Sequence, residues 1–396
     1  MNALKHELFS AIDSLNDRIV TIRHDLHAHP ELSGHEEHTK YLVKGILEAE
    51  GLQVREFDDH FGLIADLVTD PAKPFVALRA DMDALPIAEQ SDEPYASRES
   101  GVMHACGHDA HTAILLGSAI ALNRIKKHLR GNLRFIFQPA EEITEGGSSQ
   151  MIAAGALEQV RAIFGLHAYP YLNTGQIGYK TGVMMASADT FEIEIHGRSS
   201  HGARPHEGVD AILVTAMVVN SLNHIVSRRI DPLHPAVISL GTIEGGRAPN
   251  VICDHVRLTG TVRCVNREVR EAIPKMMEIS IKGICRSMHA THDFRYHFGS
   301  PEVCNDPAMV ELLVEEASTL IGREQCVDLG DPVMGGEDFG RYLERVPGAF
   351  FRLGTCDAAK GTCVAQHNSR FNVDDDALSF GMKIMAAAAV RALHDA

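Results

Sequence analysis

The sequence predicts an α/β protein with a mostly parallel central sheet, interrupted by an inserted ferredoxin-like unit. Up to about residue 185, apolar runs of strand length alternate with helical segments, the pattern of a parallel sheet covered by helices. From Thr190 the order becomes strand, helix, strand, strand, helix, strand, which is the βαββαβ order of a ferredoxin-like unit. We therefore expect one domain from residues 1–184 and 299–396, and a second from residues 185–298.

The first domain begins with a predicted surface helix. Apolar residues recur at helical spacing from Met1 to Arg23 with charged residues between them. The other elements expected in this domain are strands at 62–68, 75–79, 133–137 and 162–166, and helices at 109–127 and 375–394.

The inserted unit is bounded by turn-forming residues. Lys180–Gly182 and Gly299–Pro301 carry the glycine and proline expected of hinges. Between them we expect strands at 191–196, 236–243, 255–264 and 291–297, and helices at 208–227 and 268–289.

Composition narrows the class of protein. The chain has 396 residues, of which 45% are hydrophobic, so it can bury the cores of about two domains. The net charge of −16 argues against a nucleic-acid partner, because a phosphate backbone would be repelled. The sequence has neither a run of about twenty uninterrupted apolar residues nor a secretion signal, so we expect no membrane span. Eight cysteines without small-domain spacing predict reduced thiols and a cytoplasmic location.

The segment Met103–His111 contains a candidate metal site. Cys106 and His108 are two residues apart, and thiolate and imidazole are ligands that favour zinc and its first-row neighbours. Gly107 between them lets the backbone turn so that both side chains can face one point. Taken alone, the pattern fits a buried structural cysteine beside surface histidines equally well.

Polar residues also follow three of the predicted strands. Asp81 and Asp83 follow the strand at 75–79, Glu141 and Glu142 follow the strand at 133–137, and His167 follows the strand at 162–166. The carboxyl ends of strands in an open α/β sheet are where sites are built, so we expect a single polar site there. A Glu pair is more often a solvated loop, but beside a metal one carboxylate can bind the ion while the other acts as a general base.

Seven motifs occur in an order that resembles a known family. They resemble the amidohydrolase branch of the aminoacylase/carboxypeptidase-type metallopeptidases, which includes hippurate hydrolases, N-acyl-amino-acid amidohydrolases and auxin-conjugate hydrolases. The resemblance covers nearly the whole chain. The motifs are RADMDALP (79–86), HACGHDAH (104–111), QPAEE (138–142), GLH (165–167), HGARPH (201–206), GGEDF (335–339) and HN (367–368).

The resemblance implies a metal-dependent amidohydrolase that splits N-acyl amino acids into a carboxylic acid and a free amino acid. It implies two divalent ions, with zinc, manganese, cobalt and nickel all suited to the site. Cys106 stands where relatives outside this branch have a bridging Asp, and Asp81 stands where they have a metal-binding His, which leaves occupancy of the second metal position open. The metal ligands it implies are Cys106, His108, Glu142, His167 and His367.

The resemblance also implies the remaining roles. Glu141 would be the general base, and Asp83 the acid that orients a metal ligand. The insert would be a lid and dimerisation domain of a homodimer, whose His201 stabilises the oxyanion in its own or the neighbouring subunit. Asn250 matches a family position near the substrate carboxylate, and Arg263 is a weaker candidate for the same role.

Three alternatives stay open at this point. A dipeptidase or an N-acetyldiaminopimelate deacetylase could use the same scaffold. A non-catalytic metal-binding protein would have no need for Glu141 or His201. We expect structural roles for several other polar and apolar residues, namely His24, His27, His29, Glu337, Asp338, Met184 and Met185.

Overall fold

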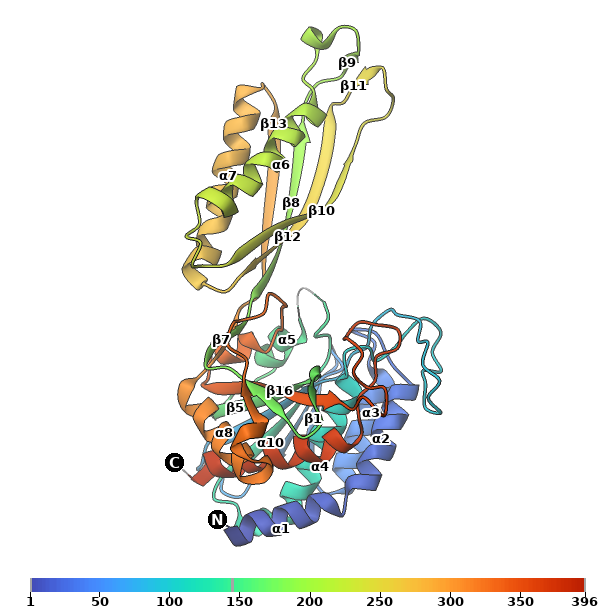
Figure 1. The fold of residues 1–396 in the computed structure, drawn as a ribbon, viewed down its shortest axis with the longest axis vertical. Coiled ribbons are helices and arrows are strands. Elements are labelled where there is room, and N and C mark those ends of the chain that lie inside the picture. The colour runs from blue at the N-terminus through green and yellow to red at the C-terminus, as the bar shows by residue number, and fades with distance from the viewer. Residues whose placement is uncertain (1, 144–145, 395–396) are drawn as a thin grey trace. The chain divides into compact units, whose positions relative to one another are not determined.

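The computed structural model describes residues 2–143 and 146–394, which divide into two compact units (Figure 1). The first unit contains Met1–Met184, Cys304–Asp331 and Asp338–Ala396. The second contains Met185–Val303 and Pro332–Glu337.

The first unit carries the large sheet and the helices around it. Its helices are α1 (Asn2–Asp13), α2 (Asn16–Ala28), α3 (Glu37–Ala49), α4 (His108–Arg124), α5 (Gly147–Ala153), α8 (Pro307–Ile321), α9 (Gly340–Leu343) and α10 (Asp376–His394). Its strands are β1 (Gln53–Glu56), β2 (Leu63–Leu67), β3 (Phe75–Asp81), β4 (Asn132–Gln138), β5 (Val160–Asn173), β6 (Ile177–Tyr179), β15 (Cys326–Asp328) and β16 (Gly348–Cys356). Strands β7 (Gly182–Met185) and β14 (Val303–Asn305) pair at the chain's two crossings between units.

Strands β1 to β6, β15 and β16 form one eight-stranded sheet in the order β1-β2-β4-β3-β5-β16-β6-β15. The central strands β4, β3, β5 and β16 are parallel, which confirms the fold class expected from the sequence. Strands β3 and β4 are buried along their whole length, as strands of a parallel sheet are when both faces are covered. Helices α4 and α10 pack against β3 and β5. Phe339, the residue before α9, packs on Gly165 of β5.

Three local details differ from the sequence expectation. The first predicted helix is two helices, α1 and α2, separated at Ser14 and Leu15. Strand β5 continues to Asn173, so His167 lies within the strand and not after it. Strand β16, which pairs with β5, comes from a segment for which no strand was predicted.

The second unit is a four-stranded antiparallel sheet covered on one face by two helices (Figure 1). Its elements are β8 (Ser187–His196), β9 (Ser200–His201), α6 (Ala211–Arg228), β10 (Ala236–Gly245), β11 (Val251–Ile252), β12 (His255–Cys264), α7 (Arg267–Ser287) and β13 (Thr291–Ser300). The strand order β10-β12-β8-β13 and the element order βαββαβ are those of a ferredoxin-like unit. Alternate residues of β8, such as Phe191 and Ile193, pack under the helices, and the residues between them face away.

One expectation drawn from composition needs correction. Cys356 and Cys363 form a disulfide, so the prediction of reduced thiols is wrong for this pair, while the other six cysteines are free.

Within the described residues, one helix, α6, is long and apolar enough to cross a membrane. Polar residues such as Thr215 and Asn220 interrupt its sequence, and its buried residues belong to the core of the second unit.

Candidate metal centre

Three parallel strands bring polar side chains to one level of the sheet. Asp81, the last residue of β3, pairs with Gln138, the last residue of β4. Arg79 pairs with Gly165 of β5, so His167, two residues further on, stands level with Asp81. The edge that the sequence predicted as the site is therefore built from β3, β4 and β5.

Gly107 sets the position of the two residues beside it. Its φ of +92° is in the left-handed region, and a Cβ there would lie 2.9 Å from the Cβ of Ala168. Glycine alone adopts this conformation without strain, and it places Cys106 just before α4 and His108 at the first position of the helix. The predicted turn at Gly107 is confirmed.

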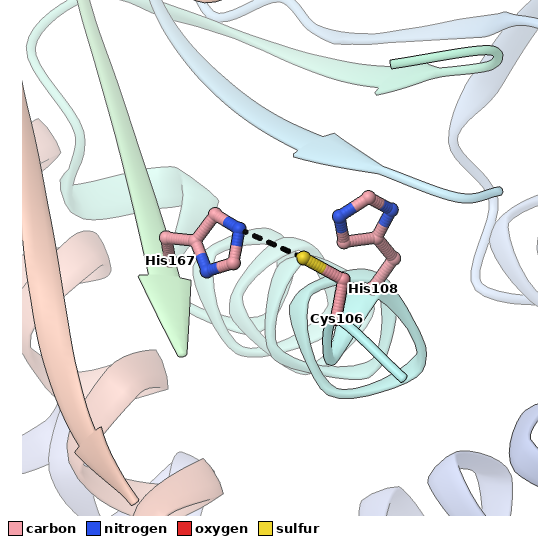
Figure 2. A group of neighbouring side chains, drawn as sticks. All are labelled: Cys106, His108 and His167. Atoms are coloured by element: carbon pink, nitrogen blue, oxygen red, sulfur yellow. Dashed lines mark hydrogen bonds between the residues drawn. The ribbon is translucent and has the colours of Figure 1, made fainter. Parts of the chain in front are cut away.

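Five metal-ligand side chains converge on this edge of the first unit. The donor atoms of Cys106, His108 and His167 lie within 4.8 Å of one another (Figure 2), and those of Cys106, Glu142 and His367 do so as well. Cys106 Sγ is 3.4 Å from His167 Nε2, and Glu142 Oε1 is 3.5 Å from His367 Nε2 and 3.9 Å from His108 Nε2. The thiol of Cys106 is common to both groups, as a bridging ligand between two ions would be.

Two of these donor atoms are buried without a hydrogen bond. Among the described residues, neither His108 Nε2 nor Glu142 Oε1 has a hydrogen-bond partner, although the His108 side chain is fully buried. An unsatisfied buried polar atom costs about 1–3 kcal/mol, and more if it is charged. A sulfur, nitrogen and oxygen donor set suits zinc and its first-row neighbours. A divalent cation therefore fits these residues.

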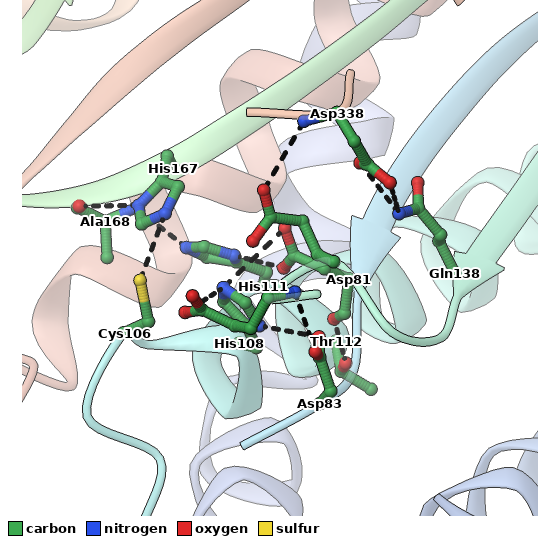
Figure 3. A network of polar contacts seen from close by, with 12 residues as sticks. Asp81, Asp83, Cys106, His108, His111, Thr112, Gln138, His167, Ala168 and Asp338 are labelled. Carbon is green, nitrogen blue, oxygen red and sulfur yellow. Dashed lines mark hydrogen bonds and ion pairs between the residues drawn. The ribbon is translucent and has the colours of Figure 1, made fainter. Parts of the chain in front are cut away.

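The other ring nitrogens of the histidines are held by the protein. His108 Nδ1 is 3.2 Å from Asp83 Oδ1, and His167 Nδ1 is 2.9 Å from the carbonyl oxygen of Ala168. A ring N–H donating to these acceptors leaves Nε2 of each imidazole with its lone pair toward the site. Asp83, which faces His108 in Figure 3, also accepts hydrogen bonds from Ser33 and from the backbone N–H of Glu142, so one carboxylate ties two candidate ligands together.

Asp81 lies beside the cluster but is already paired. Arg79 Nη1 donates to it at 2.6 Å, and His111 Nδ1 lies 2.6 Å from its other oxygen. The backbone N–H of Ala168 donates to His111 Nε2, so the ring proton of a neutral His111 is on Nδ1 and points to Asp81. Burial favours the neutral form and lowers the pKa of His111. Each carboxylate oxygen of Asp81 thus already has a partner, although the donor atoms of Asp81, His108 and His111 also lie within 4.8 Å of one another.

Burial and charge set the protonation of the ligands. Burial raises the pKa of the Cys106 thiol well above its usual range, and the Glu142 carboxylate raises it further. Burial opposes a charge on His108, but the negative charge of Asp81 and the hydrogen bond to Asp83 outweigh it and hold the pKa of His108 well above its usual value. Metal binding requires a thiolate and a neutral imidazole, so an ion entering this site must displace protons.

Glu141 lies next to Glu142 on the loop after β4. Its Oε1 accepts a hydrogen bond from the backbone N–H of Asp338 at 3.4 Å. Asp338 in turn accepts hydrogen bonds from Arg79, Gln138 and the backbone of Ser148. These contacts agree with the structural role expected for Asp338.

Two residues that support the site were missed by the sequence reasoning. Glu36 is buried and accepts the N–H of Ala140 at 2.7 Å, next to the Glu141 loop. Gln366 donates to the carbonyl oxygen of Ala168 at 3.1 Å and lies 3.9 Å from Cys106 Sγ. Its position next to His367 was the signal available, whereas nothing in the sequence connects Glu36 with Ala140.

His367 reaches the cluster from a loop. Its backbone has a φ of +62°, and its N–H donates to the carbonyl oxygen of Ala105 at 2.7 Å. This bond fixes the loop beside Cys106, although the His367 side chain is 55% exposed. Its place in the cluster could not be derived from spacing, since a lone histidine in such a loop is usually a surface residue.

The structural histidines lie below the site as expected. His27 Nδ1 is 2.8 Å from Asp109, which also pairs with the buried Arg23, and His24 pairs with Asp375. The Asp109 contacts join α2 to the start of α4, and the Asp375 contact joins α2 to the residue before α10.

The three candidate residues of the second unit are not all together. His201 pairs in register with Val251, and the N–H of Gly202 donates to the carbonyl oxygen of Asn250, so His201 and Asn250 are neighbours. Arg263 lies near the far end of β12, eight residues or roughly 26 Å of strand beyond His255. The structure therefore groups His201 with Asn250 and separates Arg263 from them.

The chain is similar to proteins of known family over most of its length. The family model described as Peptidase family M20/M25/M40 matches residues 77–391. The N-acetyl-L-cysteine deacetylase of Bacillus subtilis is 39% identical over 367 residues, 93% of this chain and 86% of the relative. The N-acyl-L-amino acid amidohydrolase of Geobacillus stearothermophilus is 42% identical over 301 residues, 76% of this chain and 81% of the relative.

A solved structure agrees with these sequence relatives. The YxeP protein of Bacillus subtilis, described as a dinuclear metal-binding peptidase of the M20 family, matches with a TM-score of 0.83 and 37% identity, over 96% of this chain and 99% of that chain. The fold, the cluster of candidate metal ligands and the relatives all indicate the same family. The chain belongs to peptidase family M20/M25/M40 and is a metal-dependent amidohydrolase.

Proposed function

We propose that the protein hydrolyses the amide bond of N-acyl amino acids, releasing a carboxylic acid and a free amino acid. The observation that carries the proposal is the pair of buried atoms without a hydrogen bond among the described residues, His108 Nε2 and Glu142 Oε1, which lie beside Cys106 and a second carboxylate, Glu141. Relatives named deacetylase and amidohydrolase support this class of substrate.

We propose two divalent ions at this site, held by Cys106, His108, Glu142, His167 and His367. The sharing of Cys106 by two groups of donors supports two positions, as does the dinuclear relative. Zinc, manganese, cobalt and nickel all suit these donors. A bound ion would supply Lewis acidity and would lower the pKa of a water molecule.

Glu141 is the proposed general base. Its carboxylate takes a proton from the attacking water, whose oxygen then adds to the amide carbonyl carbon, and it passes the proton to the nitrogen of the departing amine. Asp83 orients His108 and the backbone of Glu142 while this happens.

The second unit supplies the proposed substrate contacts. His201 donates a hydrogen bond to the oxyanion, and Asn250 contacts the substrate carboxylate. Arg263 remains the weaker candidate, because it lies apart from the other two residues within this unit.

The substitution Glu141→Gln tests the proposal. It keeps the side-chain shape and removes the base, so the variant is expected to keep its metal and lose about two or more decades of rate. Glu48→Gln, at an exposed carboxylate of α3, is the matched control and should be fully active. A Glu141→Gln enzyme with near-normal turnover would assign the base elsewhere.

The substrate class is decided by a release assay. The assay compares N-acetyl, N-benzoyl and fatty-acyl amino acids with a dipeptide and N-acetyldiaminopimelate, using protein loaded separately with each metal. A dipeptide turned over fastest would favour the peptidase alternative.

We also propose a homodimer formed through the second unit. Ile212, Leu213 and Met217 of α6 are 51%, 52% and 45% exposed, while Leu222 is buried in the core of this unit. The edge strand β10 beside them can pair with its twin. Mixing Glu141→Gln with His201→Ala subunits should restore activity if His201 serves the neighbouring site, and sedimentation as an active monomer would refute the dimer.

The proposed location is the cytoplasm. The six free cysteines support a reducing compartment, and the Cys356–Cys363 disulfide argues against one.

A further inference from the structure

The second unit carries a group of histidines and carboxylates on the sheet face that its helices leave open. Residues of β8, β12 and β13 alternate between the two faces, so Glu194, His196, His255 and Asp293 share the open face, while Ile195 and Val256 lie in the core. We call these four residues the sheet-face cluster. None of them belongs to the site described above.

Strand register places the four side chains at adjacent positions. His255 of β12 is directly opposite His196 of β8, and Asp293 of β13 is directly opposite Glu194. Side chains opposite one another on neighbouring antiparallel strands are within contact distance. The cluster thus spans three neighbouring strands of the sheet.

The donor atoms are close enough for one ion. His255 Nε2 is 3.0 Å from Glu194 Oε2, and His196 Nε2 is 2.9 Å from Asp293 Oδ2. The donor atoms of Glu194, His196 and His255 lie within 4.8 Å of one another. Ligand atoms 2.0–2.1 Å from a tetrahedral zinc ion are about 3.3 Å apart. Side-chain rotations that move the donor atoms by about 1 Å would therefore bring them to zinc-binding distances.

The charges around the cluster favour a cation. Arg257 and Arg295 are both held by Glu192, at 2.6 Å and 2.7 Å, and Arg295 is 3.4 Å from Oε1 of Glu194. These contacts leave Oε2 of Glu194 and the carboxylate of Asp293 facing the histidines. Glu244 of β10 lies opposite Arg257 on the same face, so near the cluster carboxylates outnumber the guanidinium groups of Arg257 and Arg295.

The two imidazole rings are neighbours in the cluster. The rings of His196 and His255 are 5.3 Å apart at an angle of 31°, so a nitrogen of each can bind the same ion. One divalent ion held by both rings would replace two separate imidazole–carboxylate contacts. Imidazole nitrogen and carboxylate oxygen are both zinc ligands, and a tetrahedral ion takes four of them.

We propose that the sheet-face cluster binds a zinc ion that cross-links β8, β12 and β13, separately from the catalytic metal centre. The ion stabilises the second unit and takes no part in amide hydrolysis.

The test counts zinc in the full-length protein. Three proteins are compared: the wild type, the double variant His196→Ala/His255→Ala and the control His297→Ala. The control removes an exposed histidine of β13 that lies outside the cluster. Each protein is dialysed against excess Zn²⁺, and bound zinc per chain is measured by mass spectrometry. We expect the double variant to bind one zinc fewer than wild type and the control to bind the same number. All three should hydrolyse their substrate at the same rate.

A second measurement separates this ion from the catalytic ions. In a His108→Ala background, where the catalytic centre is impaired, zinc should still raise the unfolding temperature, and the added His196→Ala/His255→Ala change should abolish that rise. Equal zinc content in wild type and the double variant, or an equal rise in unfolding temperature, would overturn the proposal. Neither readout depends on the substrate proposed for the catalytic centre.

Discussion

The two histidine clusters of the chain differ in how their nitrogen atoms are held. In the catalytic cluster of the first unit, His108 is buried, its Nδ1 is fixed by Asp83, and its Nε2 has no hydrogen-bond partner among the described residues. In the sheet-face cluster of the second unit, both Nε2 atoms already meet carboxylates, and the His196 and His255 side chains are 37% and 47% exposed.

The difference predicts which cluster is stabilised more by a bound ion. A buried unpaired donor or acceptor costs about 1–3 kcal/mol, and a bound cation removes that cost. Exposed side chains that meet partners or water carry little such cost, and exposed ion pairs contribute about 0–1 kcal/mol. We therefore expect a chelator to remove the sheet-face ion first and the catalytic ions last.

The largest expected effect comes from His108→Ala. Losing this ligand should empty much of the catalytic centre and lower kcat/KM by about three decades, since a bound metal contributes several kcal/mol to the transition state. Metal content and hydrolysis rate measure the result. His255→Ala is the matched change in the other cluster and should leave the rate unchanged. If the two variants lost activity equally, the contrast between the clusters would be wrong.

The next effect tests the support of His108 by Asp83. Asp83→Asn keeps the shape of the side chain but removes the charge that pairs with the ring of His108. Burial opposes that charge, but the hydrogen bond from His108 outweighs burial and keeps the pKa of the Asp83 carboxyl below its usual range. Replacing such a partner typically costs about 10–100-fold in metal affinity or activity. A metal titration and a rate measurement check this. Asp293→Asn, its counterpart on the open sheet face, should cost no activity, and an unchanged Asp83→Asn enzyme would remove Asp83 from the support of the site.

The sequence was informative where the site follows local structure. Cys106 and His108 flank a glycine, and Glu142 follows a buried strand, so the contacts of these residues depend on the few positions beside them. The parallel sheet then brings the strand ends together whatever the length of the connections.

The sequence was uninformative where partners are distant in the chain. Asp338 meets Arg79 and Gln138 across more than 190 residues, and no periodicity records such a pairing. The break between α1 and α2 was also missed, because Leu15 and Ile19 continue the apolar helical spacing across it and both are buried. His367 was identified only through the resemblance, and the Cys356–Cys363 bond could not be told from two loop thiols by spacing.

A smaller effect concerns Gly107. Gly107→Ala would place a Cβ in a left-handed backbone and 2.9 Å from Ala168, so we expect a loss of about 1–2 kcal/mol in the free energy of unfolding and a lower metal content. Gly51→Ala is the control, because Gly51 has a φ of +79° with open space around it. It should show the backbone strain without the loss of metal. Denaturant unfolding and metal analysis separate the two contributions, and equal metal content in both variants would show that Gly107 does not position the ligands.

The smallest expected effect is a pH dependence from Glu36 beneath the Glu141 loop. Burial and, to a smaller extent, the nearby charge of Asp83 raise the pKa of Glu36 to about 7, although backbone N–H groups donate to its carboxylate. The folded protein therefore keeps this proton up to about pH 7, whereas the unfolded chain releases it near the ordinary value of 4.5. Because the folded state binds more protons in this window, the contribution of Glu36 to stability falls as pH rises through it.

Glu36→Gln keeps an acceptor for the N–H of Ala140 and removes the titration. The free energy of unfolding of the variant, relative to wild type, should rise by about 1 kcal/mol from about pH 5.5 to about pH 6.5 and level off above about pH 7. Denaturant unfolding across this range measures it, with Glu37→Gln, at the exposed neighbouring carboxylate, as the control that should follow wild type. Parallel curves for wild type and Glu36→Gln would mean that Glu36 is already ionised in the folded protein. The loop that carries Glu141 would then contact a charged carboxylate. In that case the buried catalytic edge would differ less from the solvated sheet face than the geometry indicates.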